Sequence, residues 1–173
     1  MNAKSTMKNR QYVFSAVIWL STTVGLVISG CGRPLGHPGK TVNEVNIESI
    51  VLAIQSYEAW YGKLPITALQ TNCDIEVINS NIVAVLTAST GTAEVARFNP
   101  EHEDFIDITA RFLSNSIAID PWGNAYRFAL DANGNGRVTV SGRSIPGRIA
   151  VWSIGPNGRD DAGLGDDTIK VAR

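Results

Sequence analysis

The chain has 173 residues, of which 44% are hydrophobic, so its length suits one domain of modest size together with a targeting segment. Its formal net charge is −1, but residues 1–30 contain three basic residues and no acidic one, which leaves 12 basic and 16 acidic residues, a net charge of −4, in residues 31–173. Binding to nucleic-acid phosphates needs a clustered basic face, and this mildly acidic body has no run of lysine or arginine, so we expect no nucleic-acid partner.

The first 30 residues follow the order of a bacterial export signal. Lys4, Lys8 and Arg10 precede an uncharged, largely aliphatic stretch at 11–30, and basic residues before an apolar core are typical of a signal peptide. The sequence then reads VISGC, which resembles the bacterial lipobox, where small residues precede the cysteine that is acylated and becomes the new N-terminus. We therefore predict that residues 1–30 are a cleaved, lipoprotein-type signal peptide and that Cys31 carries the lipid.

Two alternatives to this lipid anchor remain open. At roughly 20 residues the apolar stretch is long enough to span a bilayer, so it could persist as an uncleaved membrane anchor. A disulfide between Cys31 and Cys73, the only two cysteines, would exclude acylation, whereas acylation of Cys31 would leave Cys73 as a thiol without a partner. Residues 31–40 are rich in glycine and proline, so we expect a tether there rather than a helix.

A long amphipathic helix is predicted to open the domain, which we place at residues 41–173. Thr41 and Glu44 fit a capping box, in which each side chain bonds a backbone N–H group of the first turn. Apolar residues then recur at intervals of three and four and form one stripe along the helix: Val45, Ile47, Ile50, Val51, Ile54, Tyr57 and Tyr61. We expect this stripe to pack on the core and the helix to end at Gly62 and Pro65.

The middle of the chain gives weaker signals. Asn79 or Ser80 is expected to cap a short helix that runs through Leu86. The charged run at 101–104 includes His102, but such a run is usually a solvated surface, and we expect no metal ion there. Five apolar residues are expected to fix the irregular segment that follows onto the core: Phe105, Ile106, Ile108, Phe112 and Leu113.

The sequence from residue 120 onward predicts a small antiparallel sheet. Residues 120–123, DPWG, suit a β-turn, and residues 125–130 and 137–140 are predicted to be the two strands of one hairpin, followed by a third strand at 148–153. The third strand is expected to have one covered and one partly wet face. The connecting sequence DANGNGRV is also similar to the start of an EF-hand calcium loop, but its twelfth position is Gly142 instead of glutamate, so an Asn-Gly hairpin turn is favoured.

These segments together resemble a known family. The helix end YEAWYGKLP at 57–65, the segment DPWGNAYRF at 120–128, and VWSIGPNGRDD followed by DDTI within 151–169 are similar to the major pseudopilin of bacterial type II secretion. The resemblance covers residues 41–65 and 117–169. It implies an α+β, pilin-like fold, in which a long N-terminal amphipathic helix packs on a short antiparallel sheet with a C-terminal acidic loop, and it implies a calcium ion in that loop.

The resemblance places the candidate calcium ligands in the acidic loop. Calcium takes six to eight oxygen ligands, which carboxylates, amides and backbone carbonyls supply. The candidates are the backbone carbonyl of Ile154 and the side chains of Asn157, Asp160, Asp161, Asp166 and Asp167. Asn157 lies where the family usually has an aspartate, and Thr168 shifts the register after the last aspartate. The alternative is an acidic, glycine-rich loop that binds no ion.

The resemblance does not extend to the N-terminus. The family's glycine cleavage site, followed by phenylalanine, an apolar run and a glutamate, has no counterpart here. The helix through which pseudopilins polymerise is therefore not expected in the mature chain. The sequence also lacks the G-x-S-x-G, H-E-x-x-H, C-x-x-C and P-loop motifs of common enzyme classes. We predict a non-enzymatic, lipid-anchored, pseudopilin-like protein without a small-molecule substrate.

The predicted location and partners follow from the lipid anchor. We expect a protein held in the cell envelope, facing the periplasm or the exterior, with the outer membrane favoured because Gly32 after the cysteine is no retention signal. Its partners would be the membrane and proteins of a type II secretion-like or other envelope system. The alternatives are an inner-membrane pseudopilin that keeps its N-terminal helix, and a calcium-dependent envelope binding module that uses Trp122 or Trp152.

Overall fold

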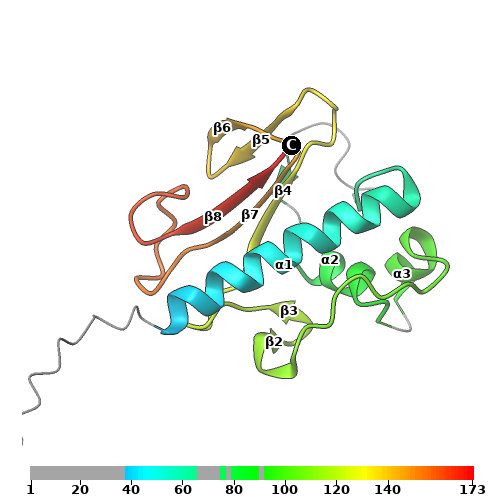
Figure 1. Ribbon diagram of the computed structural model, residues 1–173, viewed down its shortest axis with the longest axis horizontal. Helices are drawn as coiled ribbons and strands as arrows, with labels where there is room; N and C mark the ends of the chain where they lie inside the picture. Colours follow the sequence, from blue (N-terminus) through cyan, green and yellow to red (C-terminus); the bar gives the residue numbers. More distant parts are fainter. Residues whose placement is uncertain (1–37, 66–74, 77–78, 90–91) are drawn as a thin grey trace, which may run out of the picture. The chain divides into compact units, whose positions relative to one another are not determined.

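The computed structural model describes residues 38–65, 75–76, 79–89 and 92–173 (Figure 1). All of these belong to one compact unit within residues 34–173. The predicted signal peptide, Cys31, most of the predicted tether and Cys73 lie outside the described residues. The described part combines helices with antiparallel sheets, which confirms the α+β class. Among its helices, none has the length and apolar character needed to cross a membrane.

Helix α1 spans Pro38–Tyr61 and begins before the predicted cap at Thr41. Proline suits the first position of a helix because its φ is already fixed and no N–H bond is lost there. Thr41 and Glu44 are exposed inside the helix, so the predicted capping box is wrong, and the predicted tether 31–40 loses its last residues to α1. The helix ends as predicted, because Gly62 has a φ of 69° and donates its N–H to a carbonyl of the last turn at 2.8 Å.

Most of the predicted apolar stripe of α1 packs on the core. Five of its members are at most 4% exposed: Ile47, Ile50, Val51, Ile54 and Tyr57. Tyr61 is partly buried against the same cluster. Val45 was predicted to share this stripe, but it is 58% exposed and lies on the outward face of the helix. Burial of the stripe explains why α1 is held against the rest of the domain.

The main sheet has four antiparallel strands in the order β1-β4-β7-β8. The strands are β1 Ile75–Glu76, β4 Arg127–Leu130, β7 Ile149–Ser153 and β8 Thr168–Ala172. The predicted strands at 125–130 and 148–153 correspond to β4 and β7, whereas β1 and β8 were not predicted. Because β8 pairs along the whole of β7, the acidic loop lies between two paired strands and not at the C-terminus, where we had placed it.

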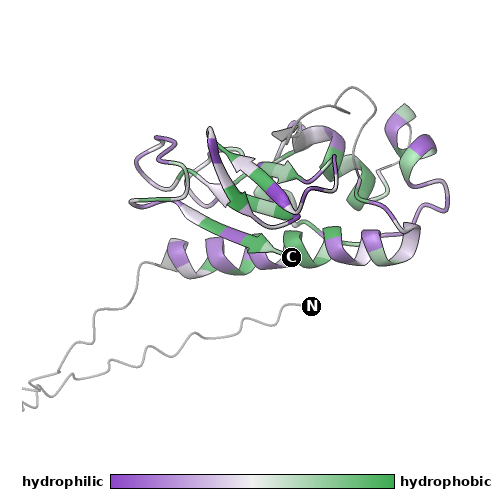
Figure 2. Ribbon diagram, turned by 90° about the horizontal axis from the view of Figure 1, so that it is seen from above, coloured by the Kyte–Doolittle hydropathy of each residue, from purple (hydrophilic) through white to green (hydrophobic). Residues whose placement is uncertain are grey.

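Both faces of this sheet are covered. Successive residues of a strand point to opposite faces, and in β7 Ile149 and Val151 join the cluster formed with α1, whereas Ala150 and Trp152 join a second cluster. Every residue of β7 is buried, so the prediction of one partly wet face for this strand is wrong. Figure 2 shows α1 running along one side of the sheet.

A hairpin contributes two of the buried residues of the second cluster. Strand β5, Arg137–Val140, pairs with β6, Arg143–Pro146. The two residues that join them, Ser141 and Gly142, have φ values of 48° and 82°, as in the type I′ hairpin turn, which needs positive φ at both positions. Both valines of β5 are fully buried beside Trp152.

The predicted hairpin between 125–130 and 137–140 is therefore wrong. Strand β4 lies between β1 and β7 in the sheet, which leaves it no free edge for β5. The predicted turn between them exists, but Asp131 holds it: its carboxylate accepts the N–H groups of Asn135 at 3.0 Å and Gly136 at 2.9 Å. The turn leads the chain into a separate hairpin and not back along β4.

The middle of the chain adds two short helices and a small strand pair. Helix α2, Asn79–Leu86, is present as predicted. Helix α3, Ala93–Phe98, was not predicted, although Thr92 caps it by accepting the N–H of Val95 at 3.2 Å. The remaining elements are η1 Ala110–Phe112, β2 Leu113–Ser114 and β3 Ile117–Ala118.

The charged run at 101–104 is exposed, as expected. Four of the predicted anchoring residues pack against the first core cluster: Phe105, Ile106, Ile108 and Leu113.

Candidate metal centre

The acidic loop, residues 154–167, leaves β7 and returns to β8 over a short span. Gly155 near its start has a φ of 65°, and a Cβ there would lie 2.5 Å from the backbone oxygen of Asp166 near its end. Only glycine fits such a close approach at a positive φ. The glycine in the WSIG sequence therefore lets the two ends of the loop meet, which brings Asp166 back beside the end of β7.

The DPWGN turn holds the start of this loop. The buried Asp120 carboxylate accepts the N–H groups of Trp122 at 2.9 Å and Asn124 at 2.8 Å, and it accepts the Ser153 hydroxyl at 2.6 Å. The Asn124 side chain in turn donates to the Gly155 carbonyl at 2.9 Å. Sequence reasoning predicted the turn but missed the roles of Asn124 and Ser153. Both residues lie inside the motifs on which the family resemblance depends, and this position is the sequence feature that could have revealed their roles.

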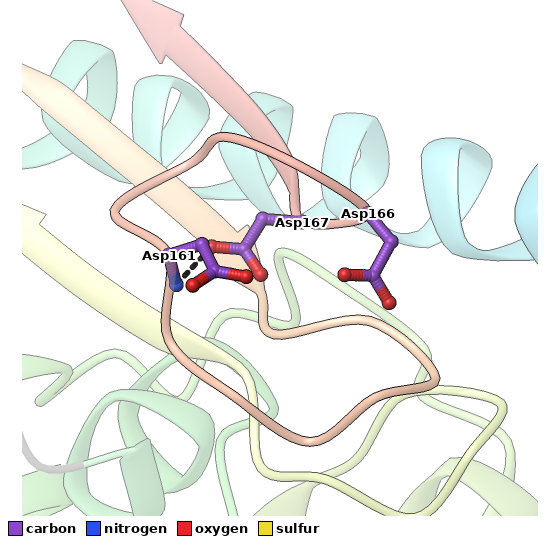
Figure 3. A group of neighbouring side chains, drawn as sticks. All are labelled: Asp161, Asp166 and Asp167. Atoms are coloured by element: carbon purple, nitrogen blue, oxygen red, sulfur yellow. Dashed lines mark hydrogen bonds between the residues drawn. The ribbon is translucent and has the colours of Figure 1, made fainter.

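Three carboxylates of the loop come together. Asp161, Asp166 and Asp167 each offer a carboxylate oxygen within 4.8 Å of the others. Figure 3 shows the three side chains pointing toward the space that the loop encloses. Like charges this close repel each other unless a cation or a proton neutralises them. Oxygen ligands grouped in this way suit hard cations such as calcium. We name this set the carboxylate triad.

Asp167 is the triad member with an unsatisfied oxygen. Its Oδ2 accepts the N–H groups of Asp161 at 2.9 Å and Gly163 at 3.0 Å. Its Oδ1 is buried and has no hydrogen-bond partner among the described residues. Burial raises the pKa of the Asp167 carboxyl, and the charges of Asp160 and Asp161 raise it further, against the two N–H bonds. A cation bound beside it would satisfy this oxygen, and the triad offers three of the six to eight oxygen ligands that calcium takes.

Asn157 is brought to the triad but presents the wrong atom for a ligand. Its backbone N–H donates to Asp166 Oδ2 at 3.0 Å, and its side-chain nitrogen donates to Asp166 Oδ1 and, at 3.4 Å, to Asp161 Oδ2. Its side-chain oxygen accepts the N–H of Arg159 at 2.6 Å. In this arrangement the N–H groups of Asn157 donate hydrogen bonds to the Asp161 and Asp166 carboxylates and so partly offset their negative charge. The side-chain oxygen of Asn157, which was predicted as a ligand, is bonded to Arg159 instead.

Asp160 does not join the triad. Its carboxylate binds the Arg127 guanidinium and the Ser141 hydroxyl, and it accepts the N–H of Ala162 at 3.0 Å. Burial acts to raise the pKa of Asp160, but the bonds from Ser141 and Ala162 and the charge of Arg127 outweigh it and lower the pKa below its ordinary value. Asp160 thus ties the loop to β4 and to the β5–β6 turn, and its predicted role as a ligand is not supported.

Ionised Asp160 is expected to stabilise the domain above about pH 4. The folded state holds its pKa below that of the unfolded chain, whose aspartates titrate near pH 4, so its contribution is complete above that value and is lost as the pH falls through the folded-state pKa. Asp160→Asn should lower the free energy of unfolding by about 1–2 kcal/mol at pH 7. Urea unfolding should show the difference shrinking at lower pH; a constant difference would contradict this, and the exposed Asp107→Asn serves as the control.

The remaining predicted residues are Ile154, Trp152 and Trp122. Ile154 packs its side chain against the second core cluster at the start of the loop, and the role of its backbone carbonyl as a ligand stays a prediction. Trp152 is fully buried, so it offers no exposed ring to a ligand. Trp122 is partly buried and, with Lys40, lines a cavity of about 340 Å³ beside the triad. Of the two tryptophans predicted for a binding module, Trp152 is thus excluded by burial, whereas Trp122 remains partly exposed at this cavity.

Comparison of the chain with protein-family models, with curated proteins and with solved structures finds no match. The likeness to the major pseudopilin therefore depends on the sequence motifs named above alone. In the structure these motifs lie at the end of α1, at the turn before β4, and in the loop that joins β7 to β8.

Proposed function

We propose that this chain is a non-enzymatic, lipid-anchored, pilin-like protein of the bacterial envelope, which serves as an accessory or structural component of a type II secretion-like system. Its globular domain is that of a pseudopilin, and its anchor is an acylated Cys31 instead of a retained apolar helix. The outer membrane is the favoured location, and the partners are other proteins of the envelope machine.

The main support for the proposal is the arrangement of the long helix, the sheet and the acidic loop. The long helix α1 packs on an antiparallel sheet, and the loop that joins the two strands nearest to it, β7 and β8, holds the carboxylate triad. The family resemblance implies this combination, and the residues that carry the resemblance occupy its key points. Gly62 ends α1, Asp120 supports the loop, and Gly155 lets the loop close.

The triad has a structural task in this proposal. Asp161, Asp166 and Asp167 would hold a calcium ion, whose charge offsets the repulsion between the three carboxylates and fixes the loop. The chain's own residues already fold the loop around this point, because the N–H groups of Asp161 and Gly163 orient Asp167. Nothing in this task requires a catalytic residue, which agrees with the absence of common enzyme motifs from the sequence.

Metabolic labelling with a radioactive fatty acid tests the anchor. We expect the label on the wild-type protein and its complete loss in Cys31→Ser, because acylation needs this thiol. Cys73→Ser is the matched control, since it removes the other cysteine, and it should keep the label. An unlabelled wild-type protein would overturn the proposal, as would a label that persists in Cys31→Ser.

A further inference from the structure

The acidic loop and the start of α1 share one end of the domain. They lie at the same end in two perpendicular views, and α3 lies at the other end (Figure 1 and Figure 2). Gly39 in the first turn of α1 lies against the indole of Trp122, because a Cβ built on Gly39 would be 3.4 Å from the ring. Trp122 in turn lines the cavity of about 340 Å³, together with Lys40 and the triad members Asp166 and Asp167. The cavity therefore lies between the first turn of α1 and the acidic loop.

Exposed apolar residues lie at this cavity. Leu164 directly precedes Gly165, which lines the cavity, and Leu164 is 58% exposed. Of the other lining residues, Pro156 and Lys40 are exposed and Trp122 is partly exposed. Apolar side chains beside an indole and a lysine are the combination that proteins place at the boundary between water and lipid. We name Lys40, Trp122, Pro156 and Leu164 the docking face.

The length of the chain before α1 keeps the docking face near the membrane. The proposed function places the lipid on Cys31, and α1 begins at Pro38. The seven residues from one to the other span at most about 25 Å, even when fully extended. The start of α1 therefore stays within that distance of the membrane surface, whereas the helix itself is about 36 Å long. The anchor thus brings this end of the domain within reach of the lipid headgroups, wherever the far end lies.

The charges around the cavity indicate which headgroup fits it. Asp160 is paired with Arg127, so the triad is left with three negative charges against the two positive charges of Lys40 and the exposed Arg159. Glu44, the next acid of α1, lies one turn further from the start of the helix. A calcium ion on the triad adds two positive charges and reverses the sign of this balance. Because the triad supplies three of the six to eight oxygens that calcium takes, coordination positions remain for the oxygens of a phosphate group.

We propose that the docking face binds the membrane that holds the lipid anchor, with an anionic phospholipid as its ligand. The headgroup phosphate enters the cavity, where Lys40 and a calcium ion on the triad bind its oxygens, and Leu164 inserts between the lipid chains. The contact is weak by itself, but the anchor raises the effective concentration of the lipid at the face. This inference rests on the lipid anchor and the calcium ion of the proposed function, and it adds a defined orientation of the domain on the membrane.

A fluorophore on the acidic loop tests the docking. The mature protein is extracted from its membrane in a Cys73→Ser background and returned to vesicles of equal parts phosphatidylcholine and phosphatidylglycerol, with an apolar, environment-sensitive fluorophore on Leu164→Cys. Calcium should shift the emission to shorter wavelength and let a spin label on the lipid chains quench it, and EGTA should reverse both effects. The same fluorophore on Ala96→Cys, exposed on α3 at the other end of the domain, should respond little. Vesicles of phosphatidylcholine alone should give little response at either position, because their headgroups carry no net charge.

A second variant separates docking from calcium binding. Lys40 lines the cavity but is not a member of the triad, so Lys40→Gln should keep the rise in melting midpoint with calcium. It should lower the ratio of docked to undocked domain about fivefold, because one basic side chain near the anionic surface is lost. Asp167→Asn should lose both the melting effect and the quenching. A docked fraction that is unchanged in Lys40→Gln would overturn the headgroup site.

The outcomes distinguish a failure of the docking from a failure of the proposed function. A lipid on Cys31 blocks its thiol, so the Cys73→Ser background without a further cysteine should take up no fluorophore; uptake would contradict the anchor and, with it, the docking. If the background stays unlabelled and calcium raises the melting midpoint, three results overturn the docking alone. They are no calcium-dependent quenching at Leu164→Cys, equal quenching at Ala96→Cys, and equal quenching in phosphatidylcholine vesicles. No effect of calcium on melting or on quenching would overturn both the calcium site and the docking.

Discussion

Replacing Trp152 with alanine is expected to lower the free energy of unfolding by about 3–5 kcal/mol. The indole is fully buried in β7, on the face of the sheet opposite α1, against Val138 and Val140 of the β5–β6 hairpin. Its removal leaves a cavity that the paired strands on both sides of β7 cannot close. Urea unfolding followed by circular dichroism measures the loss.

Two further variants make this test specific. Trp152→Phe keeps an aromatic ring in the same place and should lose less stability than the alanine variant, which separates a packing effect from a failure to fold. Leu164→Ala removes a side chain that is 58% exposed in the acidic loop and should change stability by no more than about 0.5 kcal/mol. Equal losses for Trp152→Ala and Leu164→Ala would contradict the two-sided core.

Calcium is expected to raise the melting midpoint, and Asp167→Asn is expected to abolish that rise. An ion that binds only the folded loop stabilises it by about 2.7 kcal/mol at a hundred times its dissociation constant, which corresponds to roughly 5–10 °C for a domain of this size. Asp167 belongs to the triad and has the buried, unpartnered oxygen, so Asp167→Asn removes one of the three charged ligands. Melting curves with calcium and with EGTA measure both effects.

The same variant should behave differently without calcium. The pKa of Asp167 is raised in the folded state, so its ionised form costs stability once the pH rises above the unfolded value near 4, and the cost is complete above the folded-state pKa. Without calcium, Asp167→Asn should therefore melt higher than the wild type at neutral pH. Asp160→Asn, outside the triad, should keep the calcium effect. Identical wild-type curves with calcium and EGTA would favour the loop that binds no ion.

The sequence predicts the parts of the fold that depend on local patterns. The spacing of Ile47, Val51 and Ile54 identified the buried face of α1, and the Asp120 turn followed from residue types at fixed turn positions. Strand β8 was missed because Thr168–Ala172 has only two large apolar residues, and its identity as a strand comes from pairing with β7. The wrong hairpin has the same cause, because β1 takes the edge of β4 from a distant part of the chain.

The candidate site was predictable in composition but not in geometry. Asp161, Asp166 and Asp167 were among the predicted ligands and do converge. Asp160 was also predicted, but Arg127 and Ser141, both far from it in sequence, bind its carboxylate instead. Tertiary partners of this kind decide which of several neighbouring acids faces a cation, and residue spacing alone does not contain that information.

The intact mass of the native protein extracted from its membrane tests the lipid anchor most directly. The account predicts the mass of residues 31–173 plus a diacylglycerol and its accompanying acyl group on Cys31, with no peptide from residues 1–30. A mass of 18.6 kDa, that of the complete unmodified chain, would contradict it and would favour the pseudopilin that keeps its N-terminal helix.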